Sequence, residues 1–555
     1  MFKHAIRLLS FLLISNPFLS LGQNTLGTIE IGEGIQEGYT LFAPSSSRAS
    51  YLIDNCGNVV NVWESQNTPG LSVYLTPEGN LVRTRREPSN TFFAGGTGGG
   101  IEIFNWFGAT IWEYVLSDEN NVLHHDIAIL PNGNILAIAF ERISQEEALN
   151  LGRRLDLTSE NGLWTDIIIE IEVLPNFQHE IVWKWRAIDH VMQSENPSFP
   201  NFGNSIDFPE RLDINYTIGT QSATSILDWM HSNAIDYNPE LDQIILNSRN
   251  YNEFYVIDHS TTTAEASTSE GGNSGKGGDL LYRWGNPSAY GAGSVADRKL
   301  FNQHDAHWID EGLEDGGKIF VFNNGLDRPG GLISSVDIIA PPLDEDGSYL
   351  FDGLRFGPEE AEWTYGLGAG DADITSARIS GVGRQPNGNT LITVGGSGEM
   401  IEIDKDKNVV WRYVVPVRGA MPNTQGEVPA LNTIFRSYKY PLDYPAFTNN
   451  NISIGEPIEL EPDNNFCLLL PTSELTEQVK PIELFGNLID HELRLYSSQE
   501  LSINILDING QIQQVYDLKI GEQILSLPSL APGMYFLRQS KPNSTIFVNE
   551  KFIKI

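Results

Sequence analysis

A four-strand unit recurs along most of the chain, and it restricts the possible folds more than any other feature. One half of the unit is a strand, a turn and a strand that carries Trp. Clear copies are YLIDNCGNVVNVW (51–63), IEIFNWFGATIWEY (101–114) and EIDKDKNVVWRY (402–413). Less regular copies lie at 169–185, 253–285 and 334–366. The chain therefore contains six Trp-bearing copies of one structural unit.

The other half of the unit is a strand, a Gly-containing turn and a second strand. It reads LTPEGNLV (75–82), LPNGNILAIAF (130–140) and QPNGNTLITVG (385–395), with looser versions at 234–249 and 308–325. Asn-Gly pairs suit tight hairpin turns because both residues tolerate positive φ. The flanking residues alternate between apolar and polar, which is typical of strands.

Repeated four-stranded sheets around a common centre form a propeller. We therefore predict an all-β chain whose residues 28–416 fold as a six-bladed β-propeller. The Trp residues of the six copies should occupy equivalent places and pack between blades; they are Trp63, Trp112, Trp183, Trp284, Trp363 and Trp411.

The segments outside the repeat predict an exported protein. Residues 1–22 have a basic start, an apolar run from Leu8 to Leu19 and a small-residue cleavage site ending at Gly22, as in a signal peptide. That run is too short to span a bilayer, and no longer apolar run follows, so the mature chain should have no transmembrane segment. Residues 417–480 are predicted to be a linker, and 481–555 resume a β pattern typical of a small β-sandwich.

Charge and cysteine content narrow the function classes. The formal net charge of −37 argues against nucleic-acid binding, because an acidic surface repels phosphate backbones. Cys56 and Cys467 are the only cysteines. They could pair in an exported protein or remain two free thiols. Their spacing does not suit a zinc site, and no metal is expected.

Several histidines fall at the same place in the repeat, just before the half with the Gly turn. They are His125 in HHDIAILPNGN, His231 in DWMHSNAIDYN (228–238), and His304 and His307 in QHDAHWI (303–309). Equivalent positions on successive blades face the same end of the central channel. These side chains should therefore converge, although each one taken alone could equally be a packing residue.

Two arginines follow these histidines by one strand. Arg249 lies in ILNSRN (245–250) and Arg328 in FNNGLDRPGG (322–331). A guanidinium presents a planar fork of donors that suits sulfate or carboxylate oxygens. The alternative is an ion pair with a nearby acid such as Asp327.

Together these segments resemble the bacterial aryl-sulfate sulfotransferase family, as do HHDIAILPNGNIL and ISGVGRQPNGNTLITVGG. The resemblance implies a six-bladed propeller that moves a sulfuryl group from a phenolic sulfate ester to a phenol acceptor, through a sulfated histidine. It implies no nucleotide sulfate donor, and no cofactor is expected. It places catalytic roles on His231, His304 and Arg328. The shared register adds His125 as a catalytic candidate, and Arg249, His307 and Arg378 are the candidate substrate-binding residues.

One segment departs from the family pattern. The family's nucleophilic histidine lies on a late blade, and the corresponding stretch here, ITSARISGVGRQPNGN (374–389), contains none. Its polar residues include Ser376, Arg378 and Ser380. Either another histidine attacks, or the chain is a divergent member. The rival interpretations are a non-enzymatic surface propeller that binds an anionic or aromatic ligand, and a hydrolase that releases sulfate to water.

The C-terminal segment has a resemblance of its own. ILDINGQ (505–511), LPSLAPGMYFLR (527–538) and the final KFIKI (551–555) are similar to the C-terminal sorting domain of the Bacteroidetes type IX secretion system. This resemblance implies passage across the outer membrane, with that secretion machinery as a partner and the cell surface or the medium as the destination.

Overall fold

The computed structural model describes residues 24–217, 226–462 and 467, and in the C-terminal part 482–484, 488–489, 491–498, 500–507, 512–539 and 549–554. The predicted signal peptide lies outside the described residues. The chain divides into two compact units, Met1–Cys467 and Leu468–Ile555. Among the described helices, none has the length and apolar character that a membrane crossing requires.

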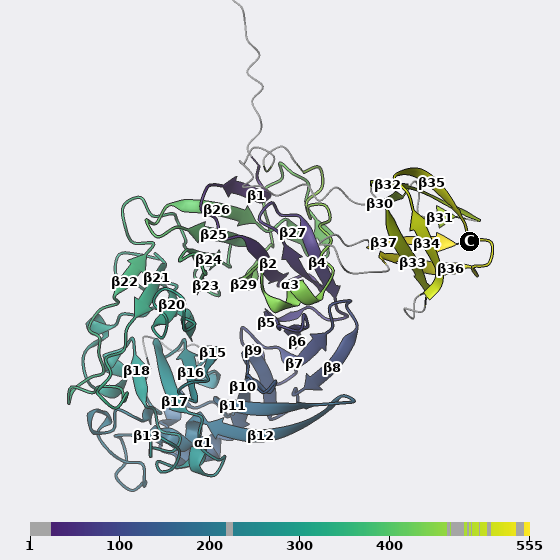
Figure 1. Ribbon diagram of the computed structural model, residues 1–555. Coiled ribbons are helices and arrows are strands. Elements are labelled where there is room, and N and C mark those ends of the chain that lie inside the picture. The colour runs from purple at the N-terminus through teal and green to yellow at the C-terminus, as the bar shows by residue number, and fades with distance from the viewer. Residues whose placement is uncertain are drawn as a thin grey trace, which may run out of the picture. The chain divides into compact units, whose positions relative to one another are not determined.

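The first unit is a six-bladed β-propeller, as the repeat predicts, and its blades are antiparallel sheets arranged around a central channel (Figure 1). One strand of each blade lines the channel. In order around the ring these innermost strands are β29 (Ile434–Pro441), β5 (Pro69–Leu75), β9 (Asn121–Ile129), β15 (Ser232–Asn238), β19 (His304–Trp308) and β23 (Gly381–Arg384).

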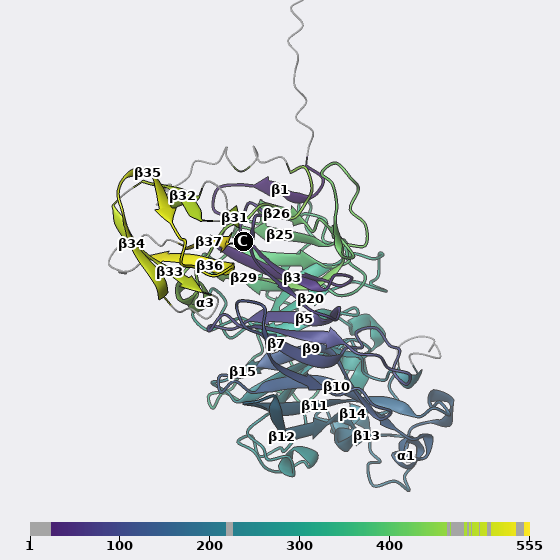
Figure 2. The same ribbon diagram turned by 90° about the vertical axis from the view of Figure 1, so that its right-hand side faces the viewer.

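The remaining strands extend each blade outward. Blade one continues with β2 (Gly38–Pro44), β3 (Ala49–Ile53) and β4 (Val59–Glu64), and blade two with β6 (Leu81–Arg86), β7 (Gly99–Phe104) and β8 (Thr110–Val115). Blade three continues with β10 (Ile135–Ile143), β11 (Leu163–Leu174) and β12 (Gln178–Arg186), and blade four with β16 (Gln243–Ser248), β17 (Glu253–Asp258) and β18 (Tyr282–Trp284). In the side view of Figure 2, β5 and β7 of blade two lie beside β9 to β12 of blade three.

Blade five continues with β20 (Ile319–Asn323), β21 (Ser335–Ile339) and β22 (Trp363–Tyr365), and blade six with β24 (Thr390–Val394), β25 (Glu399–Ile403), β26 (Val409–Val414) and finally β1 (Gly27–Ile31). Within blade three, α1 (Gln145–Asn150) lies between β10 and β11. The segments between blades add the short parallel pair β13 (Val191–Met192) and β14 (Leu212–Asp213) and the hairpin β27 (Val417–Arg418) and β28 (Met421–Pro422), and α3 (Pro445–Asn449) follows β29.

The six predicted Trp residues occupy equivalent places, each on the fourth strand of its blade counted from the channel. Most of the indoles bond to the next blade. For example, Trp63 Nε1 donates to Asn105 O at 3.0 Å, and Trp411 Nε1 donates to Asn55 O at 2.8 Å. Trp363 differs, because Lys407 of blade six lies over its ring, 5.1 Å from the centroid. The Trp residues therefore join adjacent blades.

Strands from both the N-terminal and the C-terminal end of the first unit complete the propeller, so part of the predicted linker is a strand. β1 pairs with β26 in blade six, and β29 pairs with β2 as the innermost strand of blade one. Residues 417–480 are thus not simply a linker, since 434–441 complete the propeller. The prediction failed because IFRSYKYP carries no turn signal and has no strand partner nearby in the sequence.

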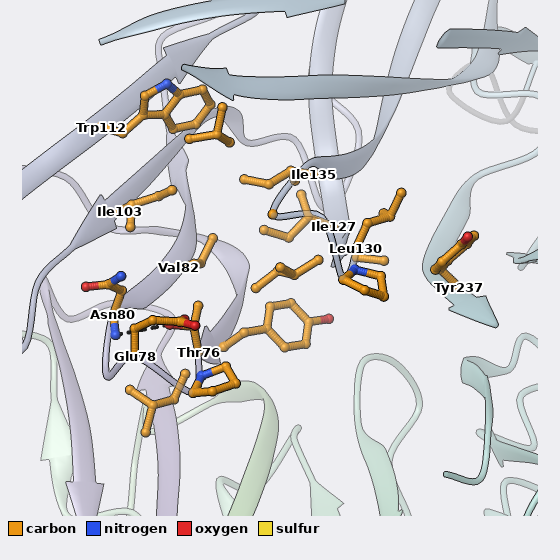
Figure 3. Close-up of a pocket in the computed structure, with 18 of the residues that line it drawn as sticks. Thr76, Glu78, Asn80, Val82, Ile103, Trp112, Ile127, Leu130, Ile135 and Tyr237 are labelled. Carbon is orange, nitrogen blue, oxygen red and sulfur yellow. Dashed lines mark hydrogen bonds between the residues drawn. The ribbon is translucent and has the colours of Figure 1, made fainter. Parts of the chain in front are cut away.

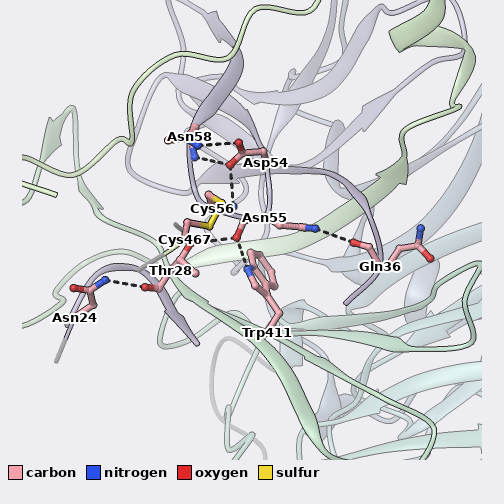
Figure 4. Close-up of a disulfide and its surroundings, with 9 residues drawn as sticks. All are labelled: Asn24, Thr28, Gln36, Asp54, Asn55, Cys56, Asn58, Trp411 and Cys467. Atoms are coloured by element: carbon pink, nitrogen blue, oxygen red, sulfur yellow. Dashed lines mark hydrogen bonds between the residues drawn. A yellow bond between two sulfur atoms is a disulfide. The ribbon is translucent and has the colours of Figure 1, made fainter. Parts of the chain in front are cut away.

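A disulfide holds the segment beyond β29 against blade one, so the cysteines pair (Figure 4). The Cα atoms of Cys56 and Cys467 are 5.8 Å apart, within the range that a bridge requires. Cys56 lies in the turn between β3 and β4. Asp54 Oδ1 supports this turn by accepting from the backbone N–H groups of Cys56 and Asn58 at 2.9 and 2.8 Å.

Removing this disulfide should destabilise the propeller. We expect the variant with Cys56→Ser and Cys467→Ser to lose about 2–5 kcal/mol of unfolding free energy, because the bridge closes a very long loop in the unfolded chain. Denaturant unfolding with and without a thiol reductant measures the loss. The reductant should lower the stability of the wild type and leave the variant unchanged; equal stability of the two oxidised proteins would contradict the prediction.

The second unit is all-β and agrees with the predicted sandwich. Its strands form a three-stranded sheet of β30 (Ile482–Leu484), β32 (Glu492–Ser497) and β35 (Gly521–Ser526), and a five-stranded sheet of β31 (Leu488–Ile489), β37 (Asn549–Lys554), β36 (Gly533–Gln539), β33 (Leu501–Asp507) and β34 (Ile512–Leu518). Strand alternation supplies the core: Leu493 and Leu495 of one sheet and Ile503 and Ile505 of the other are fully buried in one apolar cluster.

Candidate active site

Two of the predicted histidines meet at the end of the channel where the innermost strands of blades three and four begin. His125 lies in β9, and His231 directly precedes β15. Their ring centroids are 4.7 Å apart. Both residues have positive φ, 52° and 53°, which is uncommon for a residue other than glycine. Each strand has a bulge beside its histidine, and a bulge turns a side chain away from the regular alternation.

A carboxylate orients the imidazole of His231. Asp228 is buried, and its Oδ2 lies 2.5 Å from His231 Nδ1. A carboxylate accepts, so Nδ1 carries the proton and Nε2 keeps its lone pair. Among the described residues, Nε2 has no hydrogen-bond partner. His231 therefore presents a nucleophilic or basic nitrogen.

A longer network orients His125. Its Nδ1 lies 2.9 Å from Nδ1 of His124, and Nε2 of His124 lies 3.5 Å from Oδ1 of the fully buried Asp166. With the His124 proton on Nε2, facing the carboxylate, His124 Nδ1 accepts and His125 Nδ1 donates. His125 Nε2 then also keeps a lone pair. His231 is thus oriented by a hydrogen bond to a carboxylate and His125 by a hydrogen bond to His124, whose Nε2 faces Asp166 without a hydrogen bond to it.

The loop between β6 and β7 contacts these rings through glycine residues, which have no side chain. Gly96 O accepts from the N–H of His125 at 2.8 Å. A Cβ atom on Gly96, where φ is +79°, would lie only 2.0 Å from the His125 ring. Glycine is required here because the backbone lies directly against the imidazole and has positive φ.

His304 is close to this pair, but both of its nitrogens are engaged. Nδ1 donates to Asn324 Oδ1 at 2.7 Å, and Nε2 accepts from the N–H of Ile379 at 3.2 Å. Burial lowers the pKa of His304 well below its usual value, and the cation of Arg249 lowers it further. His304 is therefore neutral, and its hydrogen bond to Ile379 holds the loop at 374–380, the stretch that corresponds to the family's nucleophilic histidine.

The buried histidines should make the protein less stable in acid. Burial, followed by the charges of His231 and His124, also holds the pKa of His125 well below its usual value. Below about pH 6.5 these two histidines bind protons in the unfolded chain but not in the native protein. The free energy of unfolding therefore decreases as the pH is lowered, by up to about 1.4 kcal/mol per pH unit for each histidine. We expect His304→Asn to show a smaller drop in Tm between pH 7 and pH 5 than the wild type. Replacing the exposed His179 by Asn is the control, and equal drops in all three proteins would contradict the prediction.

The two predicted arginines, Arg249 and Arg328, have different surroundings. Arg249 begins the turn after β16, and its backbone N–H donates to His231 O at 3.3 Å. Its side chain bonds only to Asn250 Oδ1, at 3.1 Å, and forms no ion pair among the described residues. Burial lowers the pKa of this guanidinium, and Asp228 and Asp327 oppose that shift. Arg249 is therefore an available cation beside the histidines.

Among the described residues, Arg328, Arg378 and His307 form no hydrogen bond to the histidine pair. Arg328 donates to Ser335 Oγ at 2.9 Å and lies over the Phe301 ring, and it forms no hydrogen bond to the histidines and no ion pair with Asp327. Arg378 is exposed. His307 points to the opposite end of the channel, with Nδ1 donating to Asp305 O at 2.9 Å. The difference arises because His304 and His307 lie on either side of a bulge in β19.

Arg436, which sequence reasoning missed, lies at the centre of the channel. It is buried on β29, 2.6 Å from Asp126 Oδ2 and 2.9 Å from Asp305 Oδ1, and it donates to Asn233 O at 3.1 Å. Burial lowers its pKa, but the two carboxylates outweigh burial, so the pKa lies well above its usual value. The only signal in the sequence is one arginine within the aromatic strand IFRSYKYP.

This central cluster connects all six innermost strands. Asp126 Oδ1 accepts from the Tyr74 hydroxyl of β5 at 2.7 Å, and Asp305 Oδ2 accepts from the N–H of Val382 in β23 at 2.8 Å. With Arg436 of β29 and Asn233 of β15, every blade contributes a group. The cluster lies between the two ends of the channel.

Comparison with known families identifies the family of this chain. A family model described as arylsulfotransferase (ASST) matches residues 33–334, more than half of the chain. The chain belongs to the arylsulfotransferase family. The match includes the strands that carry His125, His231 and His304, and it ends before the stretch at 374–389. No curated protein matches the chain.

Solved structures with detectable similarity are distant. A protein of unknown function from Bacteroides caccae is 12% identical, with 73% of this chain and 98% of that chain covered and a TM-score of 0.38. Virginiamycin B lyase from Staphylococcus aureus is 11% identical, with 72% and 90% covered and a TM-score of 0.31. AztD from Citrobacter koseri is 7% identical, with 73% and 99% covered and a TM-score of 0.31.

Proposed function

We propose that this protein transfers a sulfuryl group from a phenolic sulfate ester to a phenol acceptor at the histidine pair. The observation that carries the proposal is the geometry of His125 and His231. Their rings lie 4.7 Å apart, and each is oriented through its Nδ1 so that Nε2 keeps a lone pair. Arg249 supplies the positive charge that an anionic ester needs on this acidic protein.

His231 is the nucleophile in this proposal. Its Nε2 attacks sulfur, the bond from sulfur to the phenolic oxygen breaks, and the phenolate leaves with the electron pair. The N-sulfated ring is cationic and keeps its Nδ1 proton, so the Asp228 carboxylate stabilises it. Arg249 donates to the sulfuryl oxygens. As in phosphoryl transfer, positioning and charge stabilisation supply most of the catalysis.

In the second half the sulfuryl group passes from His231 to the acceptor phenol. The acceptor phenol gives its proton to His125 Nε2 as its oxygen attacks sulfur, and the N–S bond breaks to restore neutral His231. His125 then releases this proton to solvent, and the phenolate that left in the first half takes up a proton from solvent, so the cycle balances. The proposal assigns the nucleophile to blade four because the stretch at 374–389 contains no histidine, and in it the backbone N–H of Ile379 donates to His304 Nε2.

An assay with a chromogenic phenyl sulfate tests this function. Purified protein is incubated with the ester, with and without a phenol acceptor. Release of the chromogenic phenol that depends on the acceptor supports transfer. Release without an acceptor would support a hydrolase, and no release at any acceptor concentration would support a propeller that only binds its ligand.

We also infer that the protein is exported to the cell surface or the medium by the type IX machinery. The basic and apolar N-terminus and the C-terminal motifs support this inference. The Cys56–Cys467 disulfide is consistent with it, because such bonds persist in oxidising compartments. A chain lacking 481–555 should accumulate inside the cell envelope, and its normal delivery to the surface would contradict the inference.

A further inference from the structure

A pair of adjoining cavities lies at the end of the channel opposite the histidine pair. The larger has a volume of about 780 Å³ and the smaller about 510 Å³. They share lining residues, among them Tyr74, Asp236 and Tyr440, so we treat them as one distal cavity. Arg436 and Asp305 line the smaller part, which places the central cluster between this cavity and the histidines. Ligand sites typically have volumes of about 300–1,000 Å³.

Aromatic and aliphatic side chains form most of the walls. Figure 3 shows Val82, Ile103, Ile127, Leu130 and Ile135 of blades two and three around the larger part, with Trp112 and Tyr237 at its sides. Tyr74, Tyr440 and Tyr444 complete the aromatic lining. Such walls accept a flat apolar body, and aromatic faces attract cations.

The charge available to a ligand is negative. The larger part is lined by Glu78 and Asp236, and no Lys or Arg lines it within the part of the chain that the structure describes. The smaller part does contain cations, but each already has a carboxylate partner. Arg384 pairs with Asp315 at 2.7 Å, Lys439 with Glu402 at 2.6 Å, and Arg436 with Asp126 and Asp305.

Asp236 lines both parts of the distal cavity, and its carboxylate lacks a positively charged partner among the described residues. Its Oδ2 accepts from the backbone N–H of Trp308 at 2.9 Å, and among the described residues it forms no ion pair. Burial raises its pKa to about 6, and the nearby His307 opposes that shift. Asp236 is half-buried, and a carboxylate partly removed from water without a counter-ion costs free energy. An uncharged residue there would be better for stability, so the carboxylate points to a ligand that supplies the positive charge.

We propose that the distal cavity binds an organic cation with an aromatic body, such as an arylalkylamine. The ammonium group lies at Asp236, and the ring lies among the tyrosines and aliphatic side chains of blades two and three. This site is separate from the proposed sulfuryl-transfer site. The net charge of −37 favours the approach of such cations.

Isothermal titration calorimetry with phenethylamine tests the proposal. The wild type should bind one molecule per chain, and phenylacetate, which has the same ring and the opposite charge, should not bind at the same concentrations. Asp236→Asn keeps the acceptor for Trp308 and should weaken binding at least about tenfold, equal to 1.4 kcal/mol. Asp406→Asn, in an exposed turn between β25 and β26, is the matched control and should bind as the wild type does.

Two further measurements distinguish a loss of amine binding from unfolding and from a loss of sulfuryl transfer. Because Asn removes a partly desolvated charge that forms no ion pair among the described residues, Asp236→Asn should melt no lower than the wild type at pH 7, so lost binding will not reflect unfolding. Its rate with phenyl sulfate should be unchanged, which separates this site from the proposed function. The proposal is overturned if phenethylamine does not bind the wild type, if phenylacetate binds equally well, or if Asp236→Asn binds phenethylamine as tightly as the wild type.

Discussion

Replacing His231 by Ala should lower the rate of sulfuryl transfer by at least about 100-fold, the lower end of the range for a general acid–base group. The loss should be larger if His231 is the nucleophile, because no covalent intermediate can then form. His125→Ala should also lower the rate at least 100-fold through loss of proton transfer. Steady-state kinetics with a chromogenic phenyl sulfate and a saturating phenol measure both effects.

The intermediate distinguishes the roles of the two histidines. Intact-protein mass after brief exposure to the ester, without acceptor, should show a sulfuryl adduct in the wild type and in His125→Ala but not in His231→Ala. Asp228→Asn should reduce the rate without preventing folding, because an amide in place of the carboxylate favours the wrong tautomer of His231. His179→Ala, on the exposed face of β12, is the control. An active enzyme whose rate is unchanged by both active-site substitutions would refute the assignment.

Replacing Arg436 by Met should have the largest effect on stability. The substitution leaves Asp126 and Asp305 buried without the guanidinium that neutralises them. Breaking a buried ion pair by removing one partner costs about 3–5 kcal/mol. Denaturant unfolding of the propeller measures the loss. Arg418→Met, on an exposed residue of β27, is the matched control and should change stability by less than about 0.5 kcal/mol.

The same cluster allows a compensation test. Adding Asp126→Asn and Asp305→Asn to Arg436→Met removes the uncompensated charges and should recover part of the lost stability. A loss below about 1 kcal/mol in the single variant would show that the cluster does not hold the six innermost strands together. No recovery in the triple variant would show that the carboxylates are not the cause of the loss.

The sequence was sufficient for the architecture of the blades. Each blade is built from residues close in the chain, with alternating apolar residues, Gly turns and a Trp at a fixed place. Local periodicity therefore predicts the strands, the six copies and the positions of Trp63 through Trp411. The same local register predicts that His125 and His231 lie at one end of the channel, because equivalent positions on successive blades are related by the ring.

Tertiary structure decided whatever depends on pairing across the ring. β29 pairs with β2 from the other end of the propeller, and nothing local marks Arg436 as the centre of the channel. Positive φ at His125 and His231 sets their rings together, and the bulge in β19 sends His307 to the opposite end from His304. Each of these features is set by contacts between strands hundreds of residues apart or by a one-residue bulge, and neither leaves a periodic signal in the chain.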